Sequence, residues 1–117
     1  MPHQIAKKRL SRTDGHRKAL LRNLATSFFK YEKIETTTSK AKEISKVVDR
    51  LITTARRGDL SSRRLVAAYL QEPAVTKKLC DQIAPALKDR TGGYTRIMKT
   101  RVRPGDAAEL SILELVK

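Results

Sequence analysis

Cysteine and histidine are scarce in this sequence, and each shortage excludes a class of function. Cys80 is the only cysteine, so neither an internal disulfide nor a cysteine-based metal site can form, as is typical of a reducing compartment. His3 and His16 are the only histidines, and no Cys, Asp or Glu accompanies them at metal-ligand spacing. Gly92-Gly93 lacks the spaced glycines and the lysine of a phosphate-binding loop. We therefore expect no enzyme, no metal, no cofactor and no small-molecule substrate.

Aromatic residues make up only 4% of the chain, and tryptophan is absent. This argues against a protein that binds single strands by stacking many bases, and the basic and aromatic strand signature of an RNA-recognition motif is also missing. No apolar run approaches the length of a membrane span, and the start, MPHQIAKKRL, lacks the hydrophobic stretch of a secretory signal. The sequence thus predicts a soluble, cytoplasmic protein with no membrane partner.

Positive charge dominates what is present. The 117 residues carry 26 Lys and Arg against 12 Asp and Glu, which gives a formal net charge of +14. Seven of these cations lie in residues 1–22 and six in residues 88–103, and each cluster contains a single Asp. Because like charges at this density repel one another, the sequence indicates a polyanionic partner, and nucleic acid is the expected one.

Hydrophobic periodicity predicts four helices. Their expected ranges are 13–31 with Thr13 as N-cap, 38–57 beginning at Thr38 or Ser39, 60–70 after the cap Asp59, and 73–84 with Pro73 in the first turn and Pro85 beyond the end. The apolar positions expected to face a core are Leu20, Leu21, Leu24, Ala25 and Phe28 in the first helix, and Leu65, Val66, Tyr69 and Leu70 in the third. We expect the arc on the first helix to pack under a sheet. In the second helix, Lys42, Lys46 and Arg50 form a basic ridge, about half of which is explained by ion pairs within the helix, such as Glu43 with Lys46.

Three strands are expected from β-branched and alternating segments. They are Lys33–Thr37, Tyr94–Val102 and a final strand within residues 107–116. The last two would form a hairpin through a turn at Arg103-Pro104-Gly105-Asp106, where proline and glycine suit a type II geometry.

A basic protein of this kind can bind structured RNA or DNA. The few aromatic residues favour recognition through backbone and shape, which is how proteins bind folded RNA. The alternative is a nucleoid or regulatory DNA-binding protein that uses residues 59–84 as a helix-turn-helix. The second helix of that pair carries only Lys77 and Lys78, while most of the charge lies elsewhere. A small RNA-processing enzyme that acts through His16 is a third hypothesis.

The sequence also resembles a known family. The resemblance rests on SRTDGHRKALLRNLATSFFKYEKIETTTSKAKE, DRTGGYTRI and RPGDAAELSILEL, which occur in this order. These segments are similar to bacterial ribosomal protein L17 of the large subunit, over about residues 10–116. The resemblance implies a structural constituent of the bacterial 50S subunit, without enzymatic activity, bound to 23S ribosomal RNA near the outer end of the peptide exit tunnel. Neighbouring large-subunit proteins are further implied partners.

The resemblance also implies a fold and a domain organisation. It implies an α+β fold, a two-layer domain in which about four helices pack on a small three-stranded mixed sheet. Residues 1–12 would form a basic N-terminal arm, and residues 13–117 a single RNA-binding domain. Residues 2–5 replace the arginine-rich opening typical of the family. We therefore expect Lys7, Lys8 and Arg9 to make the phosphate contacts of the arm.

The candidate RNA-binding residues come from the basic clusters and from positions that match the family's characteristic residues. They are Lys7, Lys8, Arg9, Arg12, His16, Arg17, Lys18, Arg22, Lys40, Lys42, Lys46, Arg90, Tyr94, Arg96, Lys99, Arg101 and Arg103. For Tyr94, stacking on a base or ribose and packing inside the protein are both open. We expect the arm, the first helix and the C-terminal hairpin to bind RNA jointly.

Overall fold

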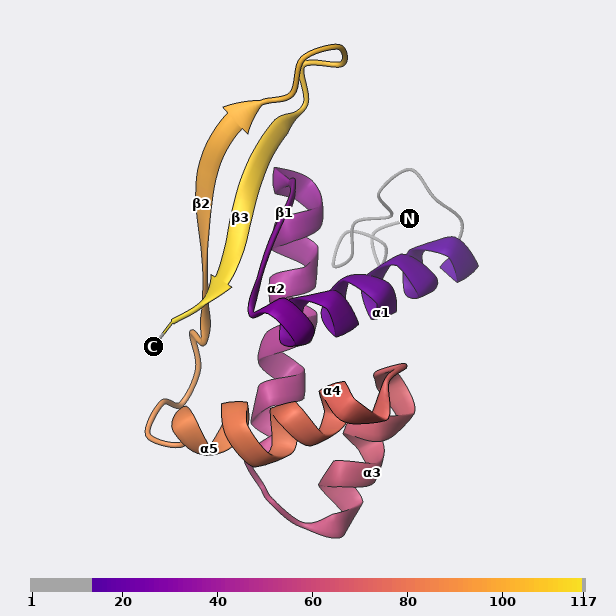
Figure 1. Ribbon diagram of the computed structural model, residues 1–117, viewed down its shortest axis with the longest axis vertical. Coiled ribbons are helices and arrows are strands. Elements are labelled where there is room, and N and C mark those ends of the chain that lie inside the picture. Colours follow the sequence, from indigo (N-terminus) through magenta and orange to yellow (C-terminus); the bar gives the residue numbers. More distant parts are fainter. Residues whose placement is uncertain (1–13, 117) are drawn as a thin grey trace, which may run out of the picture.

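The computed structural model describes residues 14–116. Its elements are α1 (Asp14–Tyr31), β1 (Lys33–Thr37), α2 (Thr38–Ala55), α3 (Leu60–Tyr69), α4 (Pro73–Lys78), the π-helical turn η2 (Leu79–Ile83), α5 (Ala84–Ala86), β2 (Thr95–Val102) and β3 (Glu109–Leu115) (Figure 1). Because α4, η2 and α5 follow one another without a break, the described part of the chain has four helical segments and three strands. The α+β class is confirmed. Thr13, the expected cap of the first helix, lies outside the described residues.

The sheet has the strand order β1-β3-β2, so the last strand of the chain lies at its centre. β3 pairs antiparallel with both neighbours, and the expected mixed sheet is therefore wrong. The reason is that β3 runs back from the hairpin turn and inserts between β1 and β2. β1 and β2 run in the same direction, but they do not pair with each other, so the sheet contains no parallel pair. In the hairpin turn, Gly105 has a φ of 101°, and a type II turn requires a positive φ at its third residue.

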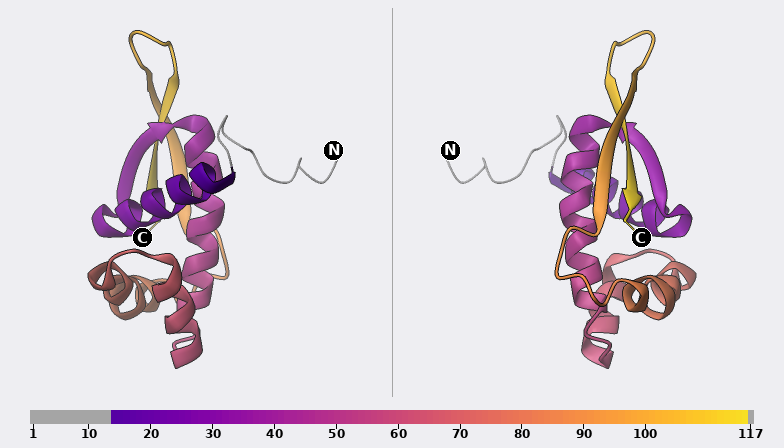
Figure 2. Two further views of the ribbon diagram at one scale, coloured as in Figure 1. Left: turned by 90° about the vertical axis from the view of Figure 1, so that its right-hand side faces the viewer. Right: turned by 90° about the vertical axis from the view of Figure 1, so that its left-hand side faces the viewer.

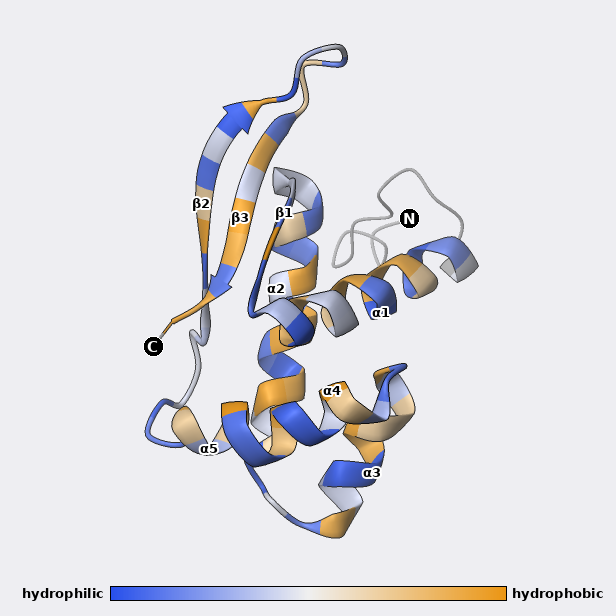
Figure 3. Ribbon diagram, in the orientation of Figure 1, coloured by the Kyte–Doolittle hydropathy of each residue, from blue (hydrophilic) through white to orange (hydrophobic). Residues whose placement is uncertain are grey.

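Helix α2 is the centre of the packing, since it contacts all three strands as well as α1 and α3. Ile44, Val48 and Ile52 are fully buried at the spacing that predicted the helix, and Figure 3 shows the hydrophobic residues recurring along it. The predicted cap is wrong, because Thr37 occupies the N-cap position. The hydroxyl of Thr38 instead lies 2.7 Å from that of Ser111 on β3, where it satisfies a polar group that is buried in the interface.

Helix α1 packs against α2, α4 and β1. It does not lie under the sheet as expected, because α2 already covers that face (Figure 1). Phe28 and Phe29 are fully buried, and their rings meet edge to face with centroids 5.4 Å apart. Leu20 and Leu24, which belong to the predicted apolar arc, are only half-buried.

Two expectations for the region after α2 are wrong. Leu65 is 61% exposed, and α3 is held by Val66 and Leu70, which are buried. The fourth helix also continues past Pro85 instead of ending before it. In the turn η2 the N–H of Ala84 bonds to the carbonyl of Leu79. A π-helical turn is wider than an α-helical turn, so it can accommodate the ring of Pro85. The helix then does not need the hydrogen bond that proline, without an N–H, cannot donate.

Asp59 caps α3 as predicted and makes the start of this helix sensitive to acid. Its carboxylate accepts the backbone N–H of Ser62 at 2.7 Å. Hydrogen bonds from the side chain and backbone of Ser62 lower the pKa of Asp59 below its ordinary value. Because the pKa is lower in the folded than in the unfolded chain, the stabilisation is complete above the unfolded pKa. It is lost as the pH falls through the folded pKa.

We expect Asp59→Ala to lower the urea midpoint of unfolding at neutral pH, because the first turn of α3 loses its acceptor. Asp59→Asn keeps an acceptor that does not titrate, so it should lose much less. The difference in stability between the wild type and Asp59→Ala should begin to shrink below about pH 4, the ordinary pKa of an aspartate in an unfolded chain, and should disappear as the pH falls through the lowered pKa of the folded protein. Circular dichroism during urea titrations at several pH values measures this, and a gap independent of pH would contradict it.

Candidate nucleic-acid interface

A groove lies between α1 and α2 and ends at the C-terminus of α3. It has a volume of about 440 Å³. Its walls come from one stripe of each long helix, because residues three and four apart share a helix face. The lining residues are Arg17, Lys18, Leu21 and Arg22 of α1, Glu43, Lys46, Val47, Arg50, Leu51 and Thr54 of α2, and Tyr69 of α3.

Five cations and one carboxylate line this groove. Lys18 and Arg50 are exposed and form no ion pair with any residue in the described part of the chain. Lys46 is also exposed, and its Nζ lies 3.5 Å from the nearly buried carboxylate of Glu43. Arg17 is buried, with 9% exposure. The cations that a large anion can reach most readily are therefore Lys18, Lys46 and Arg50.

Arg22 holds the end of α3 in place. Its Nε donates to the carbonyl of Tyr69 at 2.9 Å, and a terminal nitrogen donates to that of Ala68 at 3.3 Å. These are two of the carbonyls that a helix leaves without partners at its C-terminus, where a cation is also favoured by the dipole. Arg22 was predicted as an RNA contact, and the structure gives its guanidinium a structural task as well.

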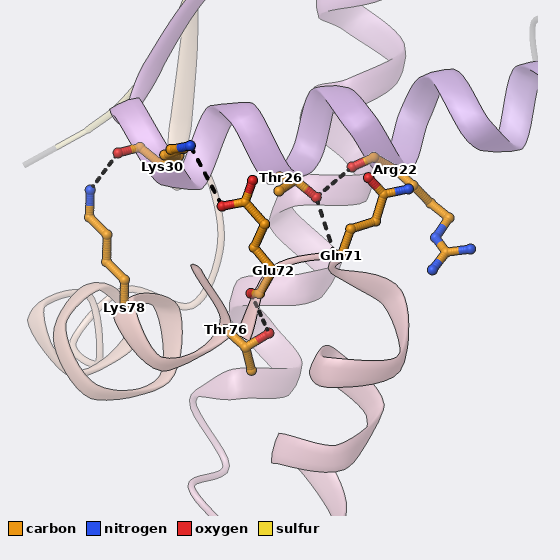
Figure 4. Close-up of polar contacts among 7 residues, drawn as sticks. All are labelled: Arg22, Thr26, Lys30, Gln71, Glu72, Thr76 and Lys78. Atoms are coloured by element: carbon orange, nitrogen blue, oxygen red, sulfur yellow. Dashed lines mark hydrogen bonds and ion pairs between the residues drawn. The ribbon is translucent and has the colours of Figure 1, made fainter. Parts of the chain in front are cut away.

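Further polar contacts fasten α1 to the junction between α3 and α4 (Figure 4). The Thr26 hydroxyl accepts the N–H of Gln71 at 3.5 Å, and Lys30 pairs with Glu72 at 3.6 Å. The ammonium of Lys78 donates to the carbonyl of Lys30 at 2.8 Å. These contacts fix α1 relative to the end of α3, where the groove closes.

Tyr69 closes the groove at the end of α3. Partial burial raises the pKa of its phenol, while the charges of Arg22 and Arg50 oppose this rise. The guanidinium of Arg22 lies 5.8 Å from the centre of the Tyr69 ring, within the range of a cation–π contact. Both side chains are half-buried, so each keeps part of its surface open.

Tyr94 cannot stack on a nucleotide, because its side chain is fully buried. Its hydroxyl accepts a hydrogen bond from Arg56, donates to the carbonyl of Arg90, and lies 3.5 Å from the Thr53 hydroxyl. Arg56 also donates to the carbonyl of Lys88. Of the two alternatives left open for Tyr94, packing inside the protein is therefore confirmed. This tyrosine fixes the loop that precedes β2, which leaves Arg90 exposed at the surface.

Each predicted cation of the hairpin has an acidic partner. The pairs are Arg96 with Glu114 at 2.6 Å, Lys99 with Glu109 at 3.7 Å, Arg101 with Glu35 at 3.3 Å and Arg103 with Asp106 at 2.5 Å. Hydrogen bonds from Thr100 and Arg101 lower the pKa of Glu35, and those from Arg103 and Ala108 lower the pKa of Asp106 to about 2. Both carboxylates are therefore ionised at neutral pH, and the hairpin surface is less positive than its lysines and arginines suggest.

The remaining predicted residues lie apart from the groove. His16 and Lys42 are exposed, Lys40 is half-buried, and none of them lines it. Lys7, Lys8, Arg9 and Arg12 lie outside the described residues. The sequence-based prediction of RNA contacts omitted Arg50, although the basic ridge on α2 includes this residue and could have identified it.

The groove and the hairpin occupy different regions of the molecule. In Figures 1 and 2, the β2–β3 hairpin extends beyond the first turn of α2, at the opposite end from α3, α4 and α5. The beginning of α1 projects on the other side of α2 from β2 and β3 (Figure 1). The start of α1 and the hairpin are therefore two separate basic regions of the surface.

The described residues show no other kind of site. Among residues 14–116, no group of three His, Cys, Asp or Glu side chains is placed to hold a metal ion. Over the same range, no helix has the length and apolar character needed to cross a bilayer. Cys80 is half-buried at the edge of the core, and burial raises the pKa of its thiol, which disfavours the reactive thiolate.

The fold and the groove define a class, that of small basic α+β proteins with a groove lined by cations from two helices. Comparison with known proteins gives the family. The pattern of the family described as Ribosomal protein L17 matches residues 20–116, and the chain belongs to this family. It is therefore a structural protein of the ribosome and not an enzyme, as predicted, and it is located in the cytoplasm.

Several bacterial relatives are similar over almost their whole length. The chain is 54% identical to the large ribosomal subunit protein bL17 of Campylobacter concisus, with 99% of this chain and 98% of the relative covered. It is 52% identical to bL17 of Helicobacter hepaticus, with 99% of this chain and 100% of the relative covered. It is 51% identical to bL17 of Pelobacter propionicus, with 100% of this chain and 92% of the relative covered.

Proposed function

We propose that this protein is a structural component of the bacterial large ribosomal subunit that binds 23S ribosomal RNA. The relatives are named as proteins of the large subunit, and this chain matches them from end to end. The observation that carries the RNA contact is the groove between α1 and α2, where five cations accompany one carboxylate. Neighbouring large-subunit proteins complete the set of proposed partners.

Binding works through the release of counterions. Each Lys or Arg that neutralises a phosphate frees a condensed cation from the RNA, so that binding gains free energy at low salt. Lys18, Lys46 and Arg50 supply this contact at the groove, where α1 and α2 present them from two sides. Because α1 packs against α2, the backbones that carry these charges need no rearrangement on binding, and the entropic cost is that of ordering the side chains.

The hairpin provides a second contact in this proposal. Arg96, Lys99 and Arg101 keep exposed side chains although they are paired with carboxylates. Exposed ion pairs contribute about 0–1 kcal/mol, so a phosphate can compete with the carboxylate for the cation. Since the hairpin and the start of α1 lie on different sides of α2 (Figure 1), the two contacts would join separate RNA segments. The arm, residues 1–12, would add further phosphate contacts.

Salt dependence and competition test the proposed function. We expect the affinity of the protein for transcribed 23S rRNA to fall by about 0.7–0.9 log units per contacted phosphate for each tenfold rise in salt. Filter binding at several salt concentrations gives this slope. At matched salt, 23S rRNA should outcompete duplex DNA of equal length. A slope near zero, or a preference for the DNA, would contradict the proposal.

A further inference from the structure

The groove has a feature that contact with phosphates alone does not require, namely an apolar floor. Leu21, Val47 and Leu51 line it together with the ring of Tyr69. Leu21 and Leu51 are 8% and 9% exposed, and Val47 is half-buried, so the floor is part of the folded core and not a mobile patch. A duplex backbone is bound mainly through its phosphates, and cations on a convex surface would suffice for that contact.

We propose that this groove holds a single nucleotide that is extruded from structured RNA, with its base on the apolar floor and its flanking phosphates at the basic rim. This inference rests on the proposed function and gives the groove a defined ligand. A volume of about 440 Å³ falls within the range of about 300–1,000 Å³ for pockets that enclose small organic groups. Specific RNA-binding proteins commonly read unstacked bases in loops and bulges in this way.

The positions of the cations fit a nucleotide that enters from a continuous strand. Lys18 lies on α1, whereas Lys46 and Arg50 lie on α2, so charge is present on both walls. A strand that bends to insert one base brings the phosphates before and after this base close to opposite walls. The single carboxylate, Glu43, is nearly buried and is paired with Lys46, so it does not reverse the attraction for phosphate.

Arg22 and Tyr69 line the groove as a fixed planar pair, and each keeps part of its surface exposed. The carbonyls of Ala68 and Tyr69 fix the Arg22 guanidinium beside the tyrosine ring. Arginine planes and aromatic rings are the usual stacking partners of extruded bases. Because both groups are already held by α3, stacking costs little side-chain entropy.

The test compares two RNA hairpins that differ by one nucleotide. One stem is fully paired, and the other carries a single bulged 2-aminopurine. We expect the wild-type protein to bind the bulged stem about tenfold more tightly, within the range for one stacked base. Val47→Phe fills the groove without a change in charge and should abolish the preference while duplex binding remains. Leu65→Phe adds the same ring on the exposed face of α3 and should keep the preference.

A measurement on the wild-type protein makes the test independent of how Val47→Phe folds. Acrylamide quenches exposed 2-aminopurine, and a base within the groove should be shielded in the complex. Equal affinity for both stems, or a bulged base that stays open to acrylamide, would overturn the inference. The proposed function fails separately, through loss of the preference for 23S rRNA over DNA.

A free nucleotide has the same chemistry as an extruded one, and a competition experiment separates the two. We expect adenosine monophosphate at millimolar concentration to leave the preference for the bulged stem intact, because it lacks a second flanking phosphate for the opposite wall. If it displaces the bulged stem from the wild-type protein, the groove is a site for free nucleotides and the inference is wrong.

Discussion

Loss of the three accessible groove cations should weaken binding to 23S rRNA about 100-fold at about 0.1 M salt, since three phosphate contacts at about 0.7 log units each are removed. The variant combines Lys18→Ala, Arg50→Ala and Lys46→Gln. Glutamine retains a donor for the nearly buried Glu43, which Lys46 contacts at 3.5 Å. The slope of affinity against salt should also become shallower by about two units, because fewer counterions are released.

A control variant with the same change in net charge distinguishes contacts made in the groove from the effect of the protein's overall electrostatic field. Arg57, Arg64 and Lys77 are exposed and lie outside the groove. Arg57→Ala, Arg64→Ala and Lys77→Gln should reduce the affinity much less, and the salt slope should stay close to that of the wild type. If the two triple variants bind equally weakly, net charge and not the groove determines the affinity. Circular dichroism establishes that both are folded.

The second large effect concerns stability. Phe28 is fully buried and meets Phe29 edge to face. Phe28→Ala should lower the free energy of unfolding by about 3–5 kcal/mol, because it removes a large apolar group and leaves a cavity in the hydrophobic core. Domains of this size have a total stability of about 5–15 kcal/mol, so the variant should unfold at a much lower urea concentration.

Tyr31 provides the control for this prediction. It lies on the same helix and is 65% exposed, and Tyr31→Ala should change the stability by about 0.5 kcal/mol or less. Urea titrations of both variants and the wild type give the two values. A cost below about 1 kcal/mol for Phe28→Ala, well under the usual range for a buried ring, would show that the packing around Phe28 is loose.

Local features of the fold could be predicted from the sequence because they depend on neighbours in the chain. The spacing of Ile44, Val48 and Ile52 predicted α2, and Asp59 and Pro73 predicted the starts of α3 and α4. The pairing of β2 with β3 followed from the predicted hairpin, but the pairing of β1 could not be predicted, since it depends on where β3 inserts. Pro85 was misread because a π-helical turn, which has no simple sequence signal, absorbs it.

The candidate site was harder to predict, because the sequence does not show which group a given Lys or Arg side chain contacts. Arg17, Lys18 and Arg22 were expected to bind RNA together, yet Arg17 is buried and Arg22 bonds to carbonyls 46 and 47 residues away. The partners of the hairpin cations follow from strand register. Arg96 faces Glu114, and Arg101 reaches Glu35 on another strand. Among Arg17, Lys18 and Arg22, only Lys18 is an exposed cation without an ion pair in the described part of the chain.

The position of β3 has a consequence for the synthesis of the protein. The central strand is the last to leave the translating ribosome, and until it emerges β1 and β2 have no partner to pair with. The helices can form earlier from local contacts, whereas the pairing of β1 with β3 joins residues about 70–80 positions apart and must wait until β3 has emerged. A nascent chain stalled before residue 109 should therefore expose two open strand edges, which favour aggregation.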